Sequence, residues 1–139
     1  MLIIKPVEEK ERQKQFADAC GIPYRAGDFA YAAYVDGVFT ALSQFRVCDT
    51  HGTLDDLVLV PASSDVEALF ILGRQTLNWI DLLGLHVCKC SPCAAPEKVL
   101  SVMGFVPAGE ENTLIADMTH MFDGHCGGHC DIARELREP

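Results

Sequence analysis

Hydrophobic and polar residues along this chain alternate with two different periods, and the changes of period predict its elements. Two β-rich runs, 29–35 and 38–47, flank the dipeptide Asp36-Gly37. This dipeptide supports the positive φ angles of a two-residue type I′ turn, so the pattern predicts a β-hairpin. The expected strands are 2–5, 29–35, 38–47, 53–60, 85–90, 105–106 and 113–122, and the expected helices are 8–20, 64–84 and 96–103.

The joint between strand 53–60 and helix 64–84 is the most informative stretch. The helix carries a broad apolar stripe, and Ser64 and Glu67 form a capping-box pattern at its start. A strand-to-helix joint can present a helix N-terminus to an anion such as a phosphate. Here the first turn contains Asp65 and Glu67 and no glycine, so the scaffold is present without the usual phosphate-binding chemistry.

Composition and charge narrow the class of protein. The 139 residues suit a single domain, which we place at 1–122, followed by a Cys/His-containing tail at 123–139. The net charge of −9 argues against nucleic acid or an anionic membrane surface as a partner. Because no apolar run reaches the ~20 residues of a membrane helix, we expect a cytoplasmic protein. The seven cysteines are then expected to be reduced, with Cys20, Cys48 and Cys88 as small buried residues.

The predicted element order resembles that of the GNAT superfamily of acyl-CoA N-acyltransferases. Leu57-Val58-Leu59-Val60-Pro61 is similar to the end of the fourth strand in that family, and Val102-Met103-Gly104-Phe105 resembles the segment that closes a later helix. The resemblance implies an α+β, three-layer fold, in which a central mixed sheet of six to seven strands is flanked by three to four helices. It covers most of residues 1–122.

The resemblance also implies a function and a cofactor. It implies an N-acetyltransferase that uses acetyl-CoA or another acyl-CoA to modify a small amine, in an active or a degenerate form, with a homodimer left open. The family holds the CoA pyrophosphate on a glycine-rich loop whose matching positions here begin at Ser63-Ser64. The amides of Val58 and Val60 would hold the acyl carbonyl, and Arg74 would reach an anion in the cleft.

Asp55 and Asp56 lie on the strand where many family members place a general base. A carboxylate there would deprotonate an amine if partial burial raised its pKa. The alternative is a pair of acids that face solvent after a hairpin. Strand alternation puts at most one of the two on the core face.

The tail supplies a second candidate site. His125, Cys126, His129 and Cys130 are four ligands of the kind that zinc prefers, and Gly127-Gly128 would let them converge. In a GNAT-like sheet the tail would emerge beside Cys48, His51 and His86, far from Cys93. The alternative function is therefore a non-enzymatic binding or regulatory protein with a tail-bound metal, and a redox role for Cys90 and Cys93 ranks last.

Overall fold

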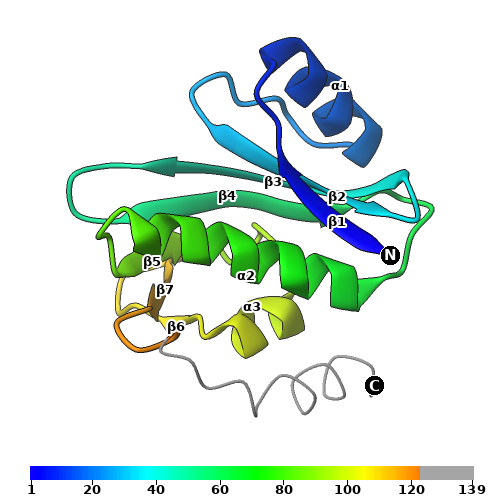
Figure 1. The fold of residues 1–139 in the computed structure, drawn as a ribbon. Coiled ribbons are helices and arrows are strands. Elements are labelled where there is room, and N and C mark those ends of the chain that lie inside the picture. Colours follow the sequence, from blue (N-terminus) through cyan, green and yellow to red (C-terminus); the bar gives the residue numbers. More distant parts are fainter. Residues whose placement is uncertain (123–139) are drawn as a thin grey trace.

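The computed structural model describes residues 1–122, which form one seven-stranded mixed sheet flanked by three helices (Figure 1). The strand order is β1-β2-β3-β4-β5-β7-β6. The strands are β1 (Leu2–Pro6), β2 (Phe29–Val35), β3 (Val38–Val47), β4 (Gly52–Leu59), β5 (Val87–Cys90), β6 (Val106–Pro107) and β7 (Leu114–Asp117). The helices are α1 (Lys10–Cys20), α2 (Val66–Leu82) and α3 (Glu97–Met103). The predicted α+β fold with a mixed sheet is confirmed.

The sheet combines an antiparallel meander with a single parallel pair. Strands β1 to β4 pair antiparallel in sequence order, β4 and β5 pair parallel, and β7 pairs antiparallel with both β5 and β6. The β2–β3 hairpin turns at Asp36 and Gly37, whose φ angles are 51° and 82°. Two positive φ angles at the turn are those of a type I′ turn, so the predicted hairpin is confirmed.

The sheet separates two hydrophobic clusters. Helix α1 lies on one face, over a small cluster around Ala17, Ala30 and Leu42, while α2 and α3 cover the other face (Figure 1). The larger cluster lies under α2 and includes Leu57 and Leu77, both fully buried. Burial of this apolar surface is the main stabilising term available to a domain of this size.

Glycine sets how closely α2 approaches its neighbours. A Cβ atom on Gly73 of α2 would lie 2.6 Å from the Met103 side chain and 2.9 Å from that of Leu57. A Cβ atom on Gly52 of β4 would lie 2.7 Å from Ile80. The absence of a side chain at both positions therefore lets α2 lie close to α3 and to the start of β4.

Several boundaries differ from the sequence prediction, and two of the differences have a clear local cause. The capping box at Ser64 is wrong, because Asp65 is the N-cap of α2 and its Oδ1 accepts the Ala68 amide at 3.0 Å. Strand β7 ends at Asp117 rather than at 122. The Asp117 carboxylate accepts the Thr119 amide at 3.0 Å, a local turn that stops the strand.

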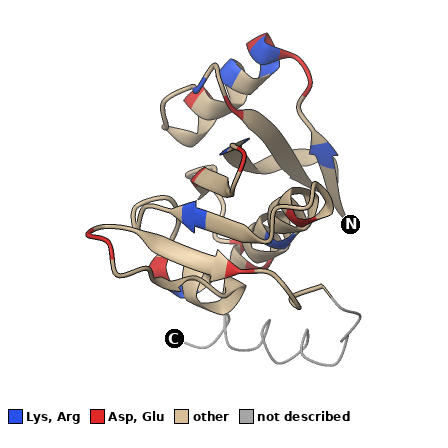
Figure 2. Cartoon of the chain, turned by 90° about the vertical axis from the view of Figure 1, so that its left-hand side faces the viewer, with Lys and Arg blue, Asp and Glu red and all other residues tan. Residues whose placement is uncertain are grey.

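Charged residues are spread over the elements of the domain. Figure 2 shows the Lys and Arg segments separated from one another by tan and red segments. No helix within residues 1–122 combines the length and apolar character that a membrane span requires.

Candidate functional site

A β-bulge places Asp55 and Asp56 on the same face of the sheet. In the β3–β4 register Gln44 faces Asp56 and Phe45 faces Leu54, which leaves Asp55 without a partner on β3. A bulge of this kind breaks the strict alternation of a strand. Asp56 and Asp55 consequently contact Gln44 and Arg46, which lie two residues apart on β3.

Both carboxylates are largely shielded from water. The exposed fractions of the Asp56 and Asp55 side chains are 10 % and 14 %. The alternative in which the pair faces solvent is therefore wrong, and so is the expectation that alternation separates them. The bulge is the physical reason for both corrections.

Gln44 is the centre of a buried polar network on the α1 face. Its Oε1 accepts the Gln13 side-chain amide at 3.0 Å and the Arg25 backbone amide at 3.1 Å. Its Nε2 donates to the Pro23 carbonyl and to Asp56 Oδ2, each at 2.9 Å. This one side chain therefore joins α1, the α1–β2 loop, β3 and β4 by hydrogen bonds that cannot be exchanged with water.

Each of the two β4 acids has an arginine partner. Arg25 Nε lies 2.6 Å from Asp56 Oδ2 and Arg25 Nη2 lies 3.4 Å from Oδ1, a two-point contact. Arg46 Nε lies 3.1 Å from Asp55 Oδ2. The chain thus supplies its own cations at the carboxylates where an amine would be expected to bind.

Asp28 is a third buried acid beside Asp55 and Asp56, and unlike them it has no ion pair with an arginine among the described residues. Its side chain is 4 % exposed, and its Oδ2 has no hydrogen-bond partner among the described residues. Burial, followed by the neighbouring Asp55 carboxylate, raises the pKa of Asp28 to about 7, although Arg25 and Arg46 oppose this. A proton on Asp28 allows this side chain to donate to the neighbouring Asp55 carboxylate.

At the joint between β4 and α2, the backbone amides of Ser63, Asp65, Val66 and Ala68 have partners within the chain. Ser63 donates to the Val60 carbonyl at 3.0 Å, and Val66 donates to the Ser64 carbonyl at 2.9 Å. Asp65 donates its amide to Ser63 Oγ at 3.1 Å and receives the Ala68 amide on its carboxylate. The N-terminus of α2 is therefore capped by an anionic side chain of its own.

The edge of β4 that faces β5 is also occupied. β5 pairs with β4 only as far as Leu54, and beyond that point the Leu57 amide donates to the Ala94 carbonyl at 2.8 Å. The segment after β5 therefore fills the space where the two strands diverge. Val60 donates instead to Thr40 of β3 at 2.9 Å, and Val58, two residues earlier, faces the same neighbour.

Arg74 lies away from this joint. It is the ninth residue of α2, roughly 12 Å along the axis from the first residue at 1.5 Å per residue. Its guanidinium carbon lies 4.9 Å from the centre of the Phe122 ring. Burial of the guanidinium against this neighbourhood lowers the pKa of Arg74.

The predicted burial of the cysteines is confirmed for two residues and wrong for the third. Cys20 and Cys88 are buried as expected, but Cys48 is exposed in the β3–β4 turn, with its Sγ 3.4 Å from His51 Nδ1. Hydrogen bonding from Thr50 lowers the pKa of Cys48, whereas burial raises the pKa of Cys90 to about 12. Cys90 is therefore a protonated thiol, which does not favour its redox role.

The predicted metal ligands His125, Cys126, His129 and Cys130 lie outside the described residues. Within 1–122, no group of three or more His, Cys, Asp or Glu side chains could hold a metal ion. Met118 donates its amide to the His86 carbonyl at 2.7 Å, and further along the chain the Phe122 ring lies 4.9 Å from the Arg74 guanidinium carbon. The predicted approach of the tail to Cys48, His51 and His86 stays a prediction.

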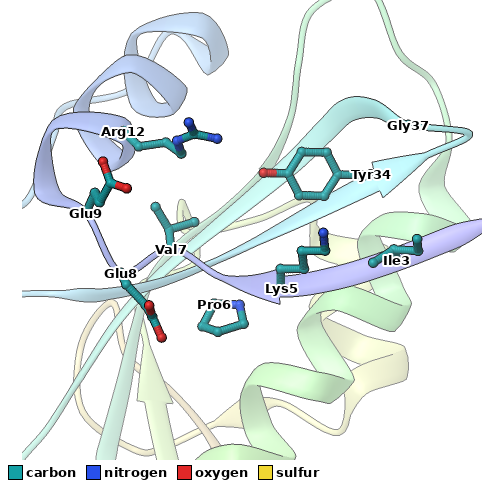
Figure 3. Close-up of a pocket in the computed structure, with 9 residues that line it drawn as sticks. All are labelled: Ile3, Lys5, Pro6, Val7, Glu8, Glu9, Arg12, Tyr34 and Gly37. Atoms are coloured by element: carbon teal, nitrogen blue, oxygen red, sulfur yellow. The ribbon is translucent and has the colours of Figure 1, made fainter.

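A cavity of about 500 Å³ lies between α1 and the β1–β2 edge (Figure 3). Its rim carries charges of both signs, with Arg12 and Glu9 on α1 and the turn before it, and Lys5 on β1. Tyr34 extends across it from β2 (Figure 3). None of the predicted site residues lines this cavity.

Asp28, Gln13 and Gln44 are not among the site residues that the sequence predicts. A weak signal existed for Gln44, which is an uncharged polar residue within the β-rich run 38–47. Buried polar side chains in such runs need partners, but the sequence does not say which residues supply them. Asp28 carries no such signal, because an acid before a strand is ordinary loop chemistry.

Solved structures with this arrangement are N-acetyltransferases. The chain has the GNAT fold. The ribosomal-protein-S18-alanine N-acetyltransferase from Escherichia coli superposes with a TM-score of 0.66 at 14 % identity, over 85 % of this chain and 94 % of that one. The PaiA N-acetyltransferase from Thermoplasma acidophilum, solved with coenzyme A, gives 0.65 at 11 % identity, over 84 % and 99 %.

A third structure, an aminoglycoside 6'-acetyltransferase type Ii, gives a TM-score of 0.63 at 11 % identity, over 84 % of this chain and 97 % of that one. No protein-family model matches the chain, and no curated protein matches its sequence. At these identities the comparisons establish the GNAT fold, which the sequence resemblance predicted.

Proposed function

We propose that this GNAT-fold protein is a small-molecule-binding protein that has lost acyl transfer from acyl-CoA. The observation that carries the proposal is the capped joint between β4 and α2, where Asp65 accepts the Ala68 amide. The residues at this joint do not fit the diphosphate of coenzyme A.

The misfit is electrostatic as well as steric. A diphosphate needs unpaired N–H groups at the positive end of a helix, with glycines that allow the backbone to approach closely. Here Asp65 and Glu67 place two negative charges in that position, and Ser63 and Val66 use their amides within the chain. A bound diphosphate would have to break these hydrogen bonds against repulsion between like charges.

The thioester side of the site gives independent support. The Leu57 amide, which faces the divergence between β4 and β5, already donates to the Ala94 carbonyl. An acyl carbonyl would have to displace this bond and the segment that contains it. Leu100 lies four residues before Gly104-Phe105, a position at which the GNAT family usually has a tyrosine that acts as the acid. It is 1 % exposed and has no titratable group.

Isothermal titration with coenzyme A and acetyl-CoA tests the proposal. We expect no saturable binding up to about 1 mM ligand. The matched variant is Asp65→Asn with Glu67→Gln, which removes both charges and retains a good N-cap residue. If charge is the obstacle, this variant binds coenzyme A at least about tenfold more tightly than the wild type. Saturable binding to the wild type in the micromolar range would overturn the proposal.

A second candidate function is N-acyl transfer to a small amine with the Asp28–Asp55 pair as the base. The observation that favours it is the unpartnered, buried Oδ2 of Asp28. Its test is turnover of acetyl-CoA with spermidine as the acceptor, at a pH above the pKa of Asp28. Asp28→Asn would then abolish turnover while Asp36→Asn, a change in the β2–β3 turn, would not. No turnover in the wild type excludes it.

The predicted metal in the tail is a separate question. Elemental analysis of protein purified without an affinity tag decides it. About one equivalent of zinc would support a regulatory metal site at His125, Cys126, His129 and Cys130, whereas less than about a tenth would exclude it.

A further inference from the structure

We propose that a second cavity, on the α2 face of the sheet, binds a small organic ammonium ion with an aromatic or other apolar body. The cavity measures about 330 Å³ and lies between the β1–α1 connection, the start of β2 and the C-terminal half of α2. Four aromatic residues line it together with two charged ones, namely Phe29, Tyr31, Phe45 and Trp79 with Glu8 and Lys10.

Four rings from three elements form one wall. The Trp79 ring centre lies 5.1 Å from that of Phe29 and 5.3 Å from that of Phe45. Tyr31 stacks on Phe45 at 5.7 Å. Phe45 is 1 % exposed and forms the base, whereas Phe29 is 50 % exposed at the rim. A half-exposed phenylalanine beside an aromatic cavity leaves apolar surface for a ligand to cover.

Glu8 gives the cavity its charge. Its side chain points away from Arg12 and Glu9, toward the opposite side of the β1–α1 connection (Figure 3). Glu8 has no ion-pair partner within the described part of the chain. Lys10 also lies on the rim, but its Nζ donates to the Gln13 side chain at 3.2 Å and to the Asp28 carbonyl. Both acceptors are uncharged, so Lys10 keeps its positive charge while its donors are used within the chain, and Glu8 is the rim group that leaves a hydrogen-bonding site for a ligand.

This combination selects a cation. The π faces of tryptophan and phenylalanine attract ammonium groups, and an unpaired carboxylate on the rim adds a charge-assisted hydrogen bond. An anion would meet the charge of Glu8, and a neutral ligand would gain only apolar contact. The volume lies at the small end of the ~300–1,000 Å³ that ligand sites occupy, so the body is expected to be about one ring in size.

The cavity is distinct from the acid cluster. Phe29 and Tyr31 face α2, whereas Asp28 lies with Asp55 on the α1 side, so the sheet separates the two sites. The inference does not depend on whether acyl-CoA binds.

The experiment uses the intrinsic fluorescence of Trp79, the single tryptophan of the chain. The full-length protein is titrated with 2-phenylethylammonium, with 2-phenylethanol as the neutral analogue and 3-phenylpropionate as the anionic one. We expect a saturable change with a Kd of about 0.1–1 mM for the ammonium ion, and at least about tenfold weaker binding of the other two.

Two matched variants separate the charge from the fold. Glu8→Gln is expected to weaken ammonium binding at least about fivefold, because it removes the rim carboxylate. Glu9→Gln, the neighbouring acid that lines the other cavity, is expected to leave it unchanged. Circular dichroism checks that both variants fold. Equal affinity for the ammonium ion and the alcohol, equal effects of the two variants, or no saturable change up to about 10 mM would each overturn the proposal.

Discussion

The two faces of the sheet are held to their helices by different kinds of interaction. Under α2 the contacts are apolar, with Leu57, Phe70 and Leu77 almost completely buried. Under α1 the hydrophobic cluster is small, and the loop after α1 is fixed by the hydrogen bonds of Gln44 and the ion pair of Asp56. Apolar contacts stabilise without strict geometry, whereas buried polar contacts stabilise only one arrangement.

This difference gives the acids of β4 a structural role. Asp56 holds the α1–β2 loop through Arg25, and Asp55 holds Arg46. A general base has to be free to receive a proton from a bound amine. Within residues 1–122, Asp28 Oδ2 is the one fully buried side-chain oxygen or nitrogen without a hydrogen-bond partner, so this atom is not committed to holding the fold together.

The comparison predicts that the largest losses of stability occur on the α2 face. Phe70→Ala should lower the free energy of unfolding by about 3–5 kcal/mol, because it leaves a cavity in a packed core. Urea-induced unfolding measures this. Leu82→Ala, at a residue of the same helix that is 75 % exposed, should change it by less than about 0.5 kcal/mol. If Phe70→Ala lowers the free energy of unfolding by only about 1 kcal/mol, the apolar contacts under α2 are not the main source of stability.

The polar face should respond to loss of its central side chain. Gln44→Leu should lower the free energy of unfolding by about 2–4 kcal/mol, since it leaves several buried polar groups without partners. Combining it with Gln13→Leu should cost less than the sum of the single changes, by at least about 0.5 kcal/mol. Strict additivity in the same urea experiment would contradict a connected network.

The stability of the α1 face should depend on pH, because the buried acid Asp28 lies there. The pKa of Asp28 is about 7 in the folded protein against roughly 3.9 in an unfolded chain. Between these values the folded state holds a proton that the unfolded state lacks. Stability should therefore fall as pH rises from about 4 to 7, by at most about 1.4 kcal/mol per pH unit, and level off above.

Asp28→Asn is the control for this titration, because it removes the proton and keeps the shape. The variant should lose this part of the pH dependence and should be more stable than the wild type at pH 8. Asp55, Arg25 and Arg46 are the charged neighbours of Asp28, and the variant leaves them unchanged. Unfolding curves at pH 5 and pH 8 that show the same difference in both proteins would assign the effect elsewhere.

The smallest effect is expected at the joint between β4 and α2. Asp65→Ala should lower the free energy of unfolding by about 1 kcal/mol, through loss of the cap on the Ala68 amide. Ser64→Ala should change it by less than about 0.5 kcal/mol, because Asp65 is the capping residue. Thermal unfolding compares the two variants. A larger loss of stability for Ser64→Ala than for Asp65→Ala would show that Ser64 is the N-cap of α2.

Much of the fold was predictable because its signals are local. The hairpin at Asp36-Gly37 depends on the φ preferences of two residues, and the limits of β2 and β3 coincide with the two β-rich runs that flank it. The predicted N-cap of α2 was wrong by one residue. Ser64 and Asp65 are both good N-cap residues, and the choice between them depends on how the chain leaves β4. The sequence placed Asp55 and Asp56 on a strand, but it did not predict that both side chains lie on one face of the sheet. That outcome depends on the bulge at Asp55, which forms only when β4 pairs with β3.

The order of strands and helices, the negative charge at the start of α2 and the single aromatic residue of its C-terminal half, Trp79, are properties of the sequence alone. Which groups find one another across the sheet was decided by the tertiary structure. Arg25 reaches Asp56, Ala94 reaches Leu57, and Trp79 reaches Phe29 over separations of 31, 37 and 50 residues. Local preference acts over a few residues, whereas these contacts depend on how the layers pack, and that is a property of the whole domain.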